Sequence, residues 1–166
     1  MTLSSYFRTA DDQQHLMWIA GATLNIMLDS AASNGSLLIM QIDSIYGEAA
    51  PVHVHANEDE VFLVLEGSLI VWVGEERREL GPGELAFLPR DLPHTYFVNS
   101  ETAKIHFLAT PGGLEQAFRE AGWDLSASVP EGWACTPQAI TDAMAKVGCQ
   151  ILGPPKGADD GPITAR

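Results

Sequence analysis

Residues 47–60 read GEAAPVHVHANEDE, and this stretch decides the fold and the chemistry of the chain. His53 and His55 are two residues apart in a β-rich run, so on a strand both imidazoles lie on the same face. Four residues rich in turn formers separate them from Glu60, which opens the next predicted strand. One hairpin can therefore bring two ring nitrogens and a carboxylate to a single point. That donor set is typical of divalent transition-metal sites.

A second hairpin supplies a fourth donor. Residues 81–84 read GPGE and predict a tight turn, and His94 later opens a strand with Tyr96 on the same face. The two histidines of the first hairpin alone could be hydrogen-bonded core residues. Adding Glu60 and His94 favours a metal site, because unpaired imidazole and carboxylate groups are costly to bury. We expect one divalent ion to be bound by His53, His55, Glu60 and His94.

Short β-rich runs separated by turn residues fill most of the chain up to about residue 110. Because no helical pattern lies between them, they predict an antiparallel sandwich or barrel. The predicted strands are residues 16–20, 22–28, 37–45, 52–55, 60–65, 69–73, 85–88, 94–99 and 103–109. Inside such a barrel, apolar and aromatic side chains are expected to form a substrate pocket, namely Phe62, Val64, Trp72, Tyr96 and Phe107.

Two helices are predicted after the strands, within residues 113–148. The first has apolar residues at helical spacing and a glycine stop, which are Leu114, Ala117, Phe118, Ala121 and Gly122. The second has a cap at Thr136, a first turn at Pro137 and an apolar stripe of Ile140, Ala143, Met144 and Val147. We expect both helices to pack outside a barrel core of residues 16–110.

The remaining segments are expected to be peripheral. Residues 123–135, between the two helices, predict a surface loop anchored by tryptophans, and a lid over an opening is the alternative. Residues 1–152 are predicted to form a single domain. Residues 153–166 are rich in proline and glycine and are predicted to be a flexible, solvated tail.

Charge and composition exclude several classes of function. The chain has 166 residues, with 9 lysines and arginines against 22 acidic residues, and a net charge of −13. Such a surface repels nucleic acid and anionic membranes, so we expect neither as a partner. No secretory signal or membrane-length apolar run is visible, and we expect a cytoplasmic protein.

Cys135 and Cys149 are expected to be free thiols. His15 is interpreted as a surface residue. His106 could face the pocket or the outside, and we favour a structural histidine with its hydrogen bonds satisfied.

These residues resemble the motifs of the cupin superfamily. The first motif, G-x5-H-x-H-x(3,4)-E-x6-G, is matched by Gly47, His53, His55, Glu60 and Gly67. The second, G-x5-P-x-G-x2-H-x3-N, is matched by Gly83, Pro89 and His94. Asp91 stands where glycine is usual, and Asn99 lies one residue late. The resemblance implies an all-β jelly-roll barrel with a metal ion inside, and a homodimer.

A narrower resemblance concerns activity. Residues 59–67, 88–96 and 110–115 are similar to bacterial proteins of the quercetin 2,3-dioxygenase-like type. This implies a metal-dependent oxygenase acting with O₂ on a flavonol-like or other enolisable small molecule, with Glu60 as general base. Three imidazoles and one carboxylate suit Fe²⁺, Mn²⁺, Co²⁺, Ni²⁺ and Zn²⁺ alike. Two alternatives stay open: an isomerase, cyclase or decarboxylase that needs no O₂, and a non-catalytic protein that binds a small molecule.

Overall fold

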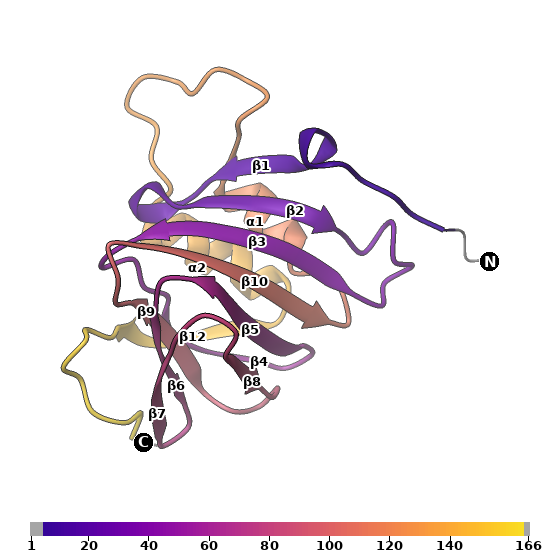
Figure 1. Cartoon of the computed structure of the whole chain (residues 1–166). Helices are drawn as coiled ribbons and strands as arrows, with labels where there is room; N and C mark the ends of the chain where they lie inside the picture. The colour runs from indigo at the N-terminus through magenta and orange to yellow at the C-terminus, as the bar shows by residue number, and fades with distance from the viewer. Residues whose placement is uncertain (1–4, 165–166) are drawn as a thin grey trace.

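Two facing β-sheets form the body of the protein in a computed structural model that describes residues 5–164 (Figure 1). The larger sheet has the strand order β11-β1-β2-β3-β10-β5-β8, and the smaller one β12-β4-β9-β6-β7. The paired strands run antiparallel. This arrangement is the predicted jelly-roll barrel.

The strand bounds follow the predicted runs closely in the middle of the chain. The larger sheet contains β1 (Gln14–Met17), β2 (Thr23–Leu28), β3 (Leu38–Ile45), β5 (Asp59–Glu66), β8 (Leu85–Leu88), β10 (Thr102–Thr110) and β11 (Trp123–Asp124). The smaller sheet contains β4 (Pro51–His55), β6 (Leu69–Val73), β7 (Glu76–Leu80), β9 (His94–Val98) and β12 (Cys149–Pro155).

Alternation along the central strands builds the core between the sheets. In β10 every second residue is buried, from Ala103 to Ala109, and the same period holds in β3 from Leu38 to Ser44. Because successive side chains on a strand point to opposite faces, one face of each strand supplies the core and the other faces out. The inward face of β5 carries Glu60, Phe62 and Val64, which brings a carboxylate into an otherwise apolar interior.

Both predicted helices are present, α1 (Glu115–Ala121) and α2 (Pro137–Lys146), with short 3₁₀ turns at Ala10–Asp12 and Ile19–Gly21. The Thr136 hydroxyl accepts a hydrogen bond from the Ala139 amide at 3.2 Å, as a cap should. The helices complete the hydrophobic core, because the Phe118 ring makes edge contacts with Trp18 and Phe107. Among the described residues, no helix is long and apolar enough to cross a membrane.

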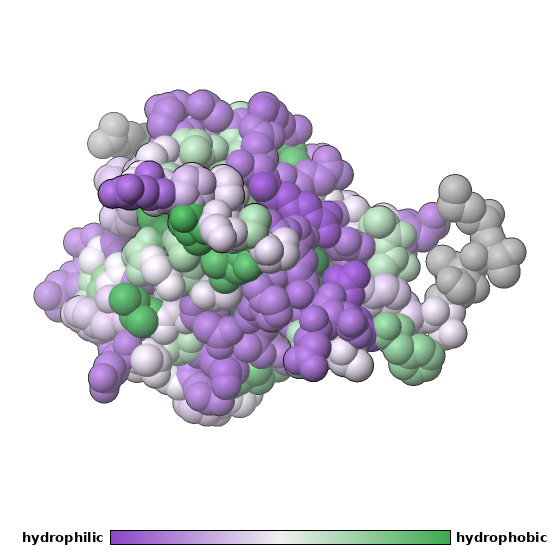
Figure 2. All heavy atoms as spheres, turned by 90° about the horizontal axis from the view of Figure 1, so that it is seen from above, coloured by the Kyte–Doolittle hydropathy of each residue, from purple (hydrophilic) through white to green (hydrophobic). Residues whose placement is uncertain are grey.

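The loop between β11 and α2 projects from the body beside β1, on the opposite side of the molecule from β4 and β8 (Figure 1). Trp123, in β11, and Trp133, in the loop, lie with their rings 5.8 Å apart. Seen from the side on which the loop projects, the surface is mostly hydrophilic with scattered hydrophobic groups (Figure 2). The predicted loop of residues 123–135 therefore begins with two residues that form the strand β11, and its remainder lies at the surface.

The segment from residue 153 differs from the predicted flexible tail. Residues 153–155 belong to β12, which pairs with β4. Farther on, Ala158 and Ile163 pack against a small apolar cluster of Ile70, Trp72 and Phe97 on the outside of the smaller sheet. The physical reason is that the outer face of β6 and β9 carries the large apolar side chains of this cluster, which need a cover. Two prolines are tolerated in β12 because it lies at the edge of its sheet.

A test of the barrel turns concerns Gly67, between β5 and β6. Its φ is +78°, and a Cβ there would lie 2.2 Å from the Thr102 carbonyl oxygen. We expect Gly67→Ala to lower the free energy of unfolding by about 3 kcal/mol, since it adds both backbone strain and a clash. Gly83→Ala is the matched control: its φ is +85° but no heavy atom lies within 4 Å of the added carbon. Urea unfolding should show a loss of only about 1 kcal/mol there, and equal losses would contradict the argument.

Candidate metal centre

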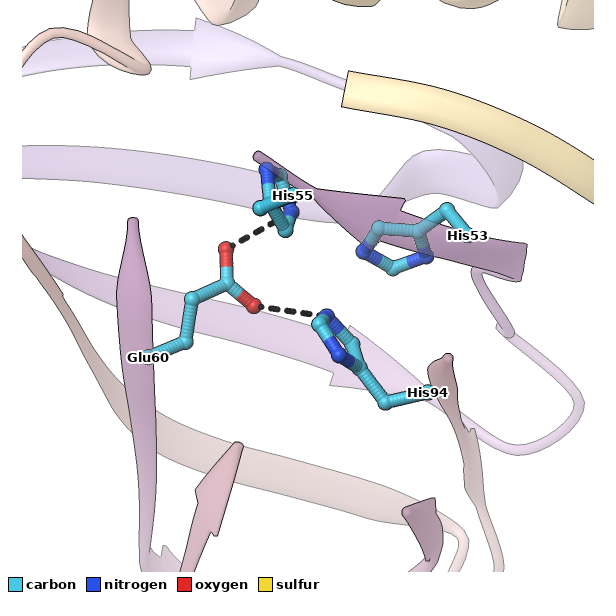
Figure 3. Close-up of side chains that lie close together, drawn as sticks. All are labelled: His53, His55, Glu60 and His94. Carbon is cyan, nitrogen blue, oxygen red and sulfur yellow. Dashed lines mark ion pairs between the residues drawn. The ribbon is translucent and has the colours of Figure 1, made fainter. Parts of the chain in front are cut away.

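Three strands bring the four predicted ligands together inside the barrel. His53 and His55 lie on β4, Glu60 on β5 and His94 on β9, where His94 is the register partner of His53. Their side chains point toward one another from these separate strands (Figure 3). One donor atom from each residue can be chosen so that all four lie within 4.8 Å of one another. His55, Glu60 and His94 are buried and His53 is partly exposed.

The Glu60 carboxylate is the centre of this group. Its Oε1 lies 3.1 Å from Nε2 of His55, and its Oε2 lies 3.2 Å from Nε2 of His94. Neither of these two buried ring nitrogens has a hydrogen-bond partner within the described part of the chain. Buried nitrogens left without a hydrogen bond, facing a carboxylate, are what a metal ion would satisfy, so the residues fit a divalent ion.

The main chain fixes the orientation of two of the three imidazoles. Nδ1 of His53 lies 2.8 Å from the Pro51 carbonyl oxygen, and Nδ1 of His94 lies 2.9 Å from the Leu92 carbonyl oxygen. A carbonyl oxygen can only accept, so in both rings Nδ1 carries the proton and Nε2 has the free lone pair. Both rings therefore hold the tautomer that a metal ligand at Nε2 requires.

The electrostatics also favour a cation. Burial would raise the pKa of Glu60, but His55 and His94 beside it lower that pKa below the usual range of a carboxyl group. Burial would lower the pKa of His55, but the neighbouring side chains of Cys149, Glu58 and Glu60 raise it to about 12. Burial, followed by the charge on His94, lowers the pKa of His53 to about 3. An ionised carboxylate beside basic and neutral imidazoles favours a positive charge, which either a proton or a metal ion supplies.

Four of the five residues expected to line the pocket face the barrel interior. The Phe62 ring lies 5.1 Å from that of Tyr96 and 5.6 Å from that of Phe107, and Val64 is buried in the same core. The prediction for Trp72 was wrong. In the pairing of β6 with β9, His94 is opposite Val73 and Thr95 is opposite Trp72, so Trp72 lies on the outer face. There its Nε1 donates to the Asp160 carbonyl oxygen at 3.3 Å.

The other two histidines lie on the outer face of the larger sheet. His15 is partly buried, and its Nδ1 lies 2.5 Å from Oδ1 of Asn25. His106 alternates with the buried Ile105 and Phe107 and points away from the interior, which decides between the two orientations that the sequence left open.

Asp91 explains a departure from the second motif. Its φ is +63°, in the left-handed region that favours glycine, and aspartate is one of the few other residues that tolerate it. Its amide donates to the His55 carbonyl oxygen at 2.8 Å, which ties this turn to the ligand strand. The turn shape is therefore kept without the usual glycine.

Sequence reasoning missed a second buried acid in the interior. Glu48 is 2% exposed, and its carboxylate accepts hydrogen bonds from the Tyr96 hydroxyl at 3.0 Å and the Ser44 hydroxyl at 3.2 Å. Burial raises the pKa of Glu48 to about 7, although those two hydrogen bonds work in the opposite direction. The only signal in the sequence is its place after Gly47, and no periodicity marks it as inward.

Comparison with known proteins agrees with this fold. Residues 44–111 match the family described as "Cupin domain". Quercetin 2,3-dioxygenase of Bacillus subtilis (strain 168) is 26% identical over 108 residues, which are 65% of this chain and 31% of that protein. The chain therefore spans less than a third of the length of this relative.

Solved structures share the fold at low sequence identity. KdgF from Halomonas sp. has a TM-score of 0.60 and 19% identity, covering 66% of this chain and 98% of that chain. Pac13 from Streptomyces, described as a nucleoside dehydratase, has a TM-score of 0.54 and 16% identity, covering 68% of this chain and 88% of that chain. At these identities the likeness shows the fold alone.

A pH-dependent test follows from Glu48. Because the pKa of Glu48 is about 7 in the folded state and 4.5 for an ordinary glutamate, the folded state retains the proton longer. The free energy of unfolding should therefore fall as the pH rises from about 4.5 to 7. Glu48→Gln removes this penalty and should be more stable than wild type by up to about 3 kcal/mol at pH 8. Urea unfolding at several pH values measures it. An unchanged pH slope in Glu48→Gln would contradict the argument, and the exposed Glu79→Gln is the control.

Proposed function

Because this chain is a member of the cupin superfamily, we propose that it is a metal-dependent oxygenase acting on an enolisable small molecule, of the flavonol-cleaving type. His53, His55, Glu60 and His94 would hold one divalent transition-metal ion, and Glu60 would also be the general base. The observation that carries the proposal is the buried Glu60 carboxylate between two ring nitrogens that lack hydrogen bonds.

A divalent ion at these donors would act as a Lewis acid that lowers the pKa of a substrate hydroxyl or enol. Glu60 alone is a weak base, since its own pKa is lowered by His55 and His94. Proton transfer to it becomes favourable only from a hydroxyl that has been made more acidic. Glu60 would thus accept the hydroxyl proton on a carboxylate oxygen, and the electron-rich enolate would be the species that reacts with O₂.

The interior supports a flat, apolar substrate. Phe62, Val64 and Phe107 make the interior beside the proposed ligands apolar, and the Tyr96 hydroxyl there is already engaged by Glu48. These apolar side chains would exclude water from the reacting enolate, and few polar side chains would be near enough to form hydrogen bonds with it. The distant similarity to quercetin 2,3-dioxygenase of Bacillus subtilis supports this substrate class.

Metal binding can be tested apart from activity. We expect Fe²⁺, Mn²⁺, Co²⁺, Ni²⁺ or Zn²⁺ to raise the melting temperature by roughly 5–10 °C when present at about 100 times its Kd. His94→Ala should abolish this rise, because it removes a donor at the centre. His106→Ala, on the outer face, should keep it. Scanning fluorimetry with each ion is the measurement, and a rise that persists in His94→Ala would contradict the assignment of the site.

The reaction can be tested with quercetin as the probe. Metal-loaded protein in air is expected to consume O₂ and bleach the flavonol band, and Glu60→Gln should slow this by roughly 10² to 10⁴-fold. An oxygen electrode and absorbance spectroscopy measure both. Absence of O₂ uptake with every ion would refute the oxygenase. Turnover of an enolisable substrate without O₂ would instead favour the isomerase, cyclase or decarboxylase alternative.

A further inference from the structure

The three imidazoles at the centre are not held in the same way. His53 and His94 each have Nδ1 within 2.9 Å of a main-chain carbonyl oxygen two residues earlier in the chain. For His55, Nδ1 has no hydrogen-bond partner of this kind among the described residues. What lies near it is a side-chain carboxylate: Oε2 of Glu58 is 3.5 Å from that nitrogen.

Glu58 is an unusual residue for a hairpin turn. Only 5% of it is exposed, and its Oε2 has no hydrogen bond within residues 5–164. Among the residues that the structure describes, the group that its carboxylate pairs with is His55. Because burying an unpaired carboxylate is costly, its position beside Nδ1 needs a compensating partner, and a ring N–H supplies one.

The C-terminal segment closes the space behind His55. In the pairing of β12 with β4, Cys149 is opposite His55. Next to it the Ala56 amide donates to the Gly148 carbonyl oxygen at 3.2 Å. These C-terminal residues lie outside the matched stretch of 44–111, so the surroundings of His55 are completed by a part of the chain that the family match does not include.

We propose that Glu58 is a positioning residue that accepts the Nδ1–H of His55 and thereby directs Nε2 of that ring toward the metal and strengthens it as a donor. The inference rests on the metal site proposed above. A carboxylate behind a ligating imidazole fixes the tautomer and raises the basicity of the ring more than a neutral carbonyl does. His55 is thus the ligand whose strength a side chain sets.

The experiment uses the full chain and Zn²⁺ alone, which is diamagnetic and needs no substrate. Zn²⁺ affinity is measured by chelator competition for wild type, Glu58→Ala, Glu58→Gln and Cys149→Ala. The matched control is Asp59→Asn, which removes a carboxylate one residue away whose ion pair is with Arg90 at 2.7 Å. In parallel, NMR of the Zn²⁺-loaded proteins follows the Nδ1–H proton of each imidazole.

We expect Glu58→Ala to weaken Zn²⁺ binding by roughly 10 to 100-fold, with a smaller loss in Glu58→Gln, whose amide oxygen can still accept the hydrogen bond. The Nδ1–H signal of His55 should shift in both variants, while those of His53 and His94 stay in place. Glu58→Gln is close in size and guards against misfolding of the alanine variant.

Three results would overturn the inference. They are an unchanged affinity and His55 signal in Glu58→Ala, an equal loss in Asp59→Asn, and a His55 shift caused by Cys149→Ala but not by the Glu58 variants. Failure of wild type to bind Zn²⁺ or any other divalent ion would reject the proposed function together with this inference. Normal binding by wild type and by Glu58→Ala would reject the inference alone.

Discussion

The structure depends on keeping one charged carboxylate inside an apolar barrel. Glu60 is 2% exposed and shares its inward face with Phe62 and Val64, so water cannot solvate its charge. An isolated carboxylate in such a place would neutralise itself or destabilise the fold. The imidazoles of His55 and His94 prevent this, and they come from two other strands. The contacts of Glu60 with His55 and His94 therefore join β5 to β4 and β9, and the same side chains could carry out chemistry.

Much of this centre could be predicted because it depends on local geometry. The spacing of His53 and His55 fixes a common face on any strand, and the short turn to Glu60 fixes a hairpin. Gly67 and Asp91 hold left-handed turns whose residue types are restricted by sterics. The helix α2 could be predicted because cap, first turn and apolar stripe agree at Thr136, Pro137 and Ile140.

What could not be predicted depends on long-range pairing. The run LIVWV at residues 69–73 is apolar at every position, so only its register with β9 shows that Trp72 faces outward. The charged ERREL run of β7 has no apolar alternation, and it becomes a strand because it lies at a sheet edge. In the same way Glu48 and Glu58 were hidden, since nothing in their neighbourhood marks an acid as buried. The homodimer and the cytoplasmic location stay predictions.

The pairing of β4 with β12 has a consequence for how the protein is assembled. β4 is an early strand, and one of its two neighbours comes from residues 149–155. Contacts so far apart in sequence form slowly, because a long loop must close before they add stability. Until then β4, which carries His53 and His55, has one edge without a paired strand. During synthesis all four proposed ligands are therefore present before the strand that closes the outer edge of β4 has been made, and that edge is the last part of the centre to be covered.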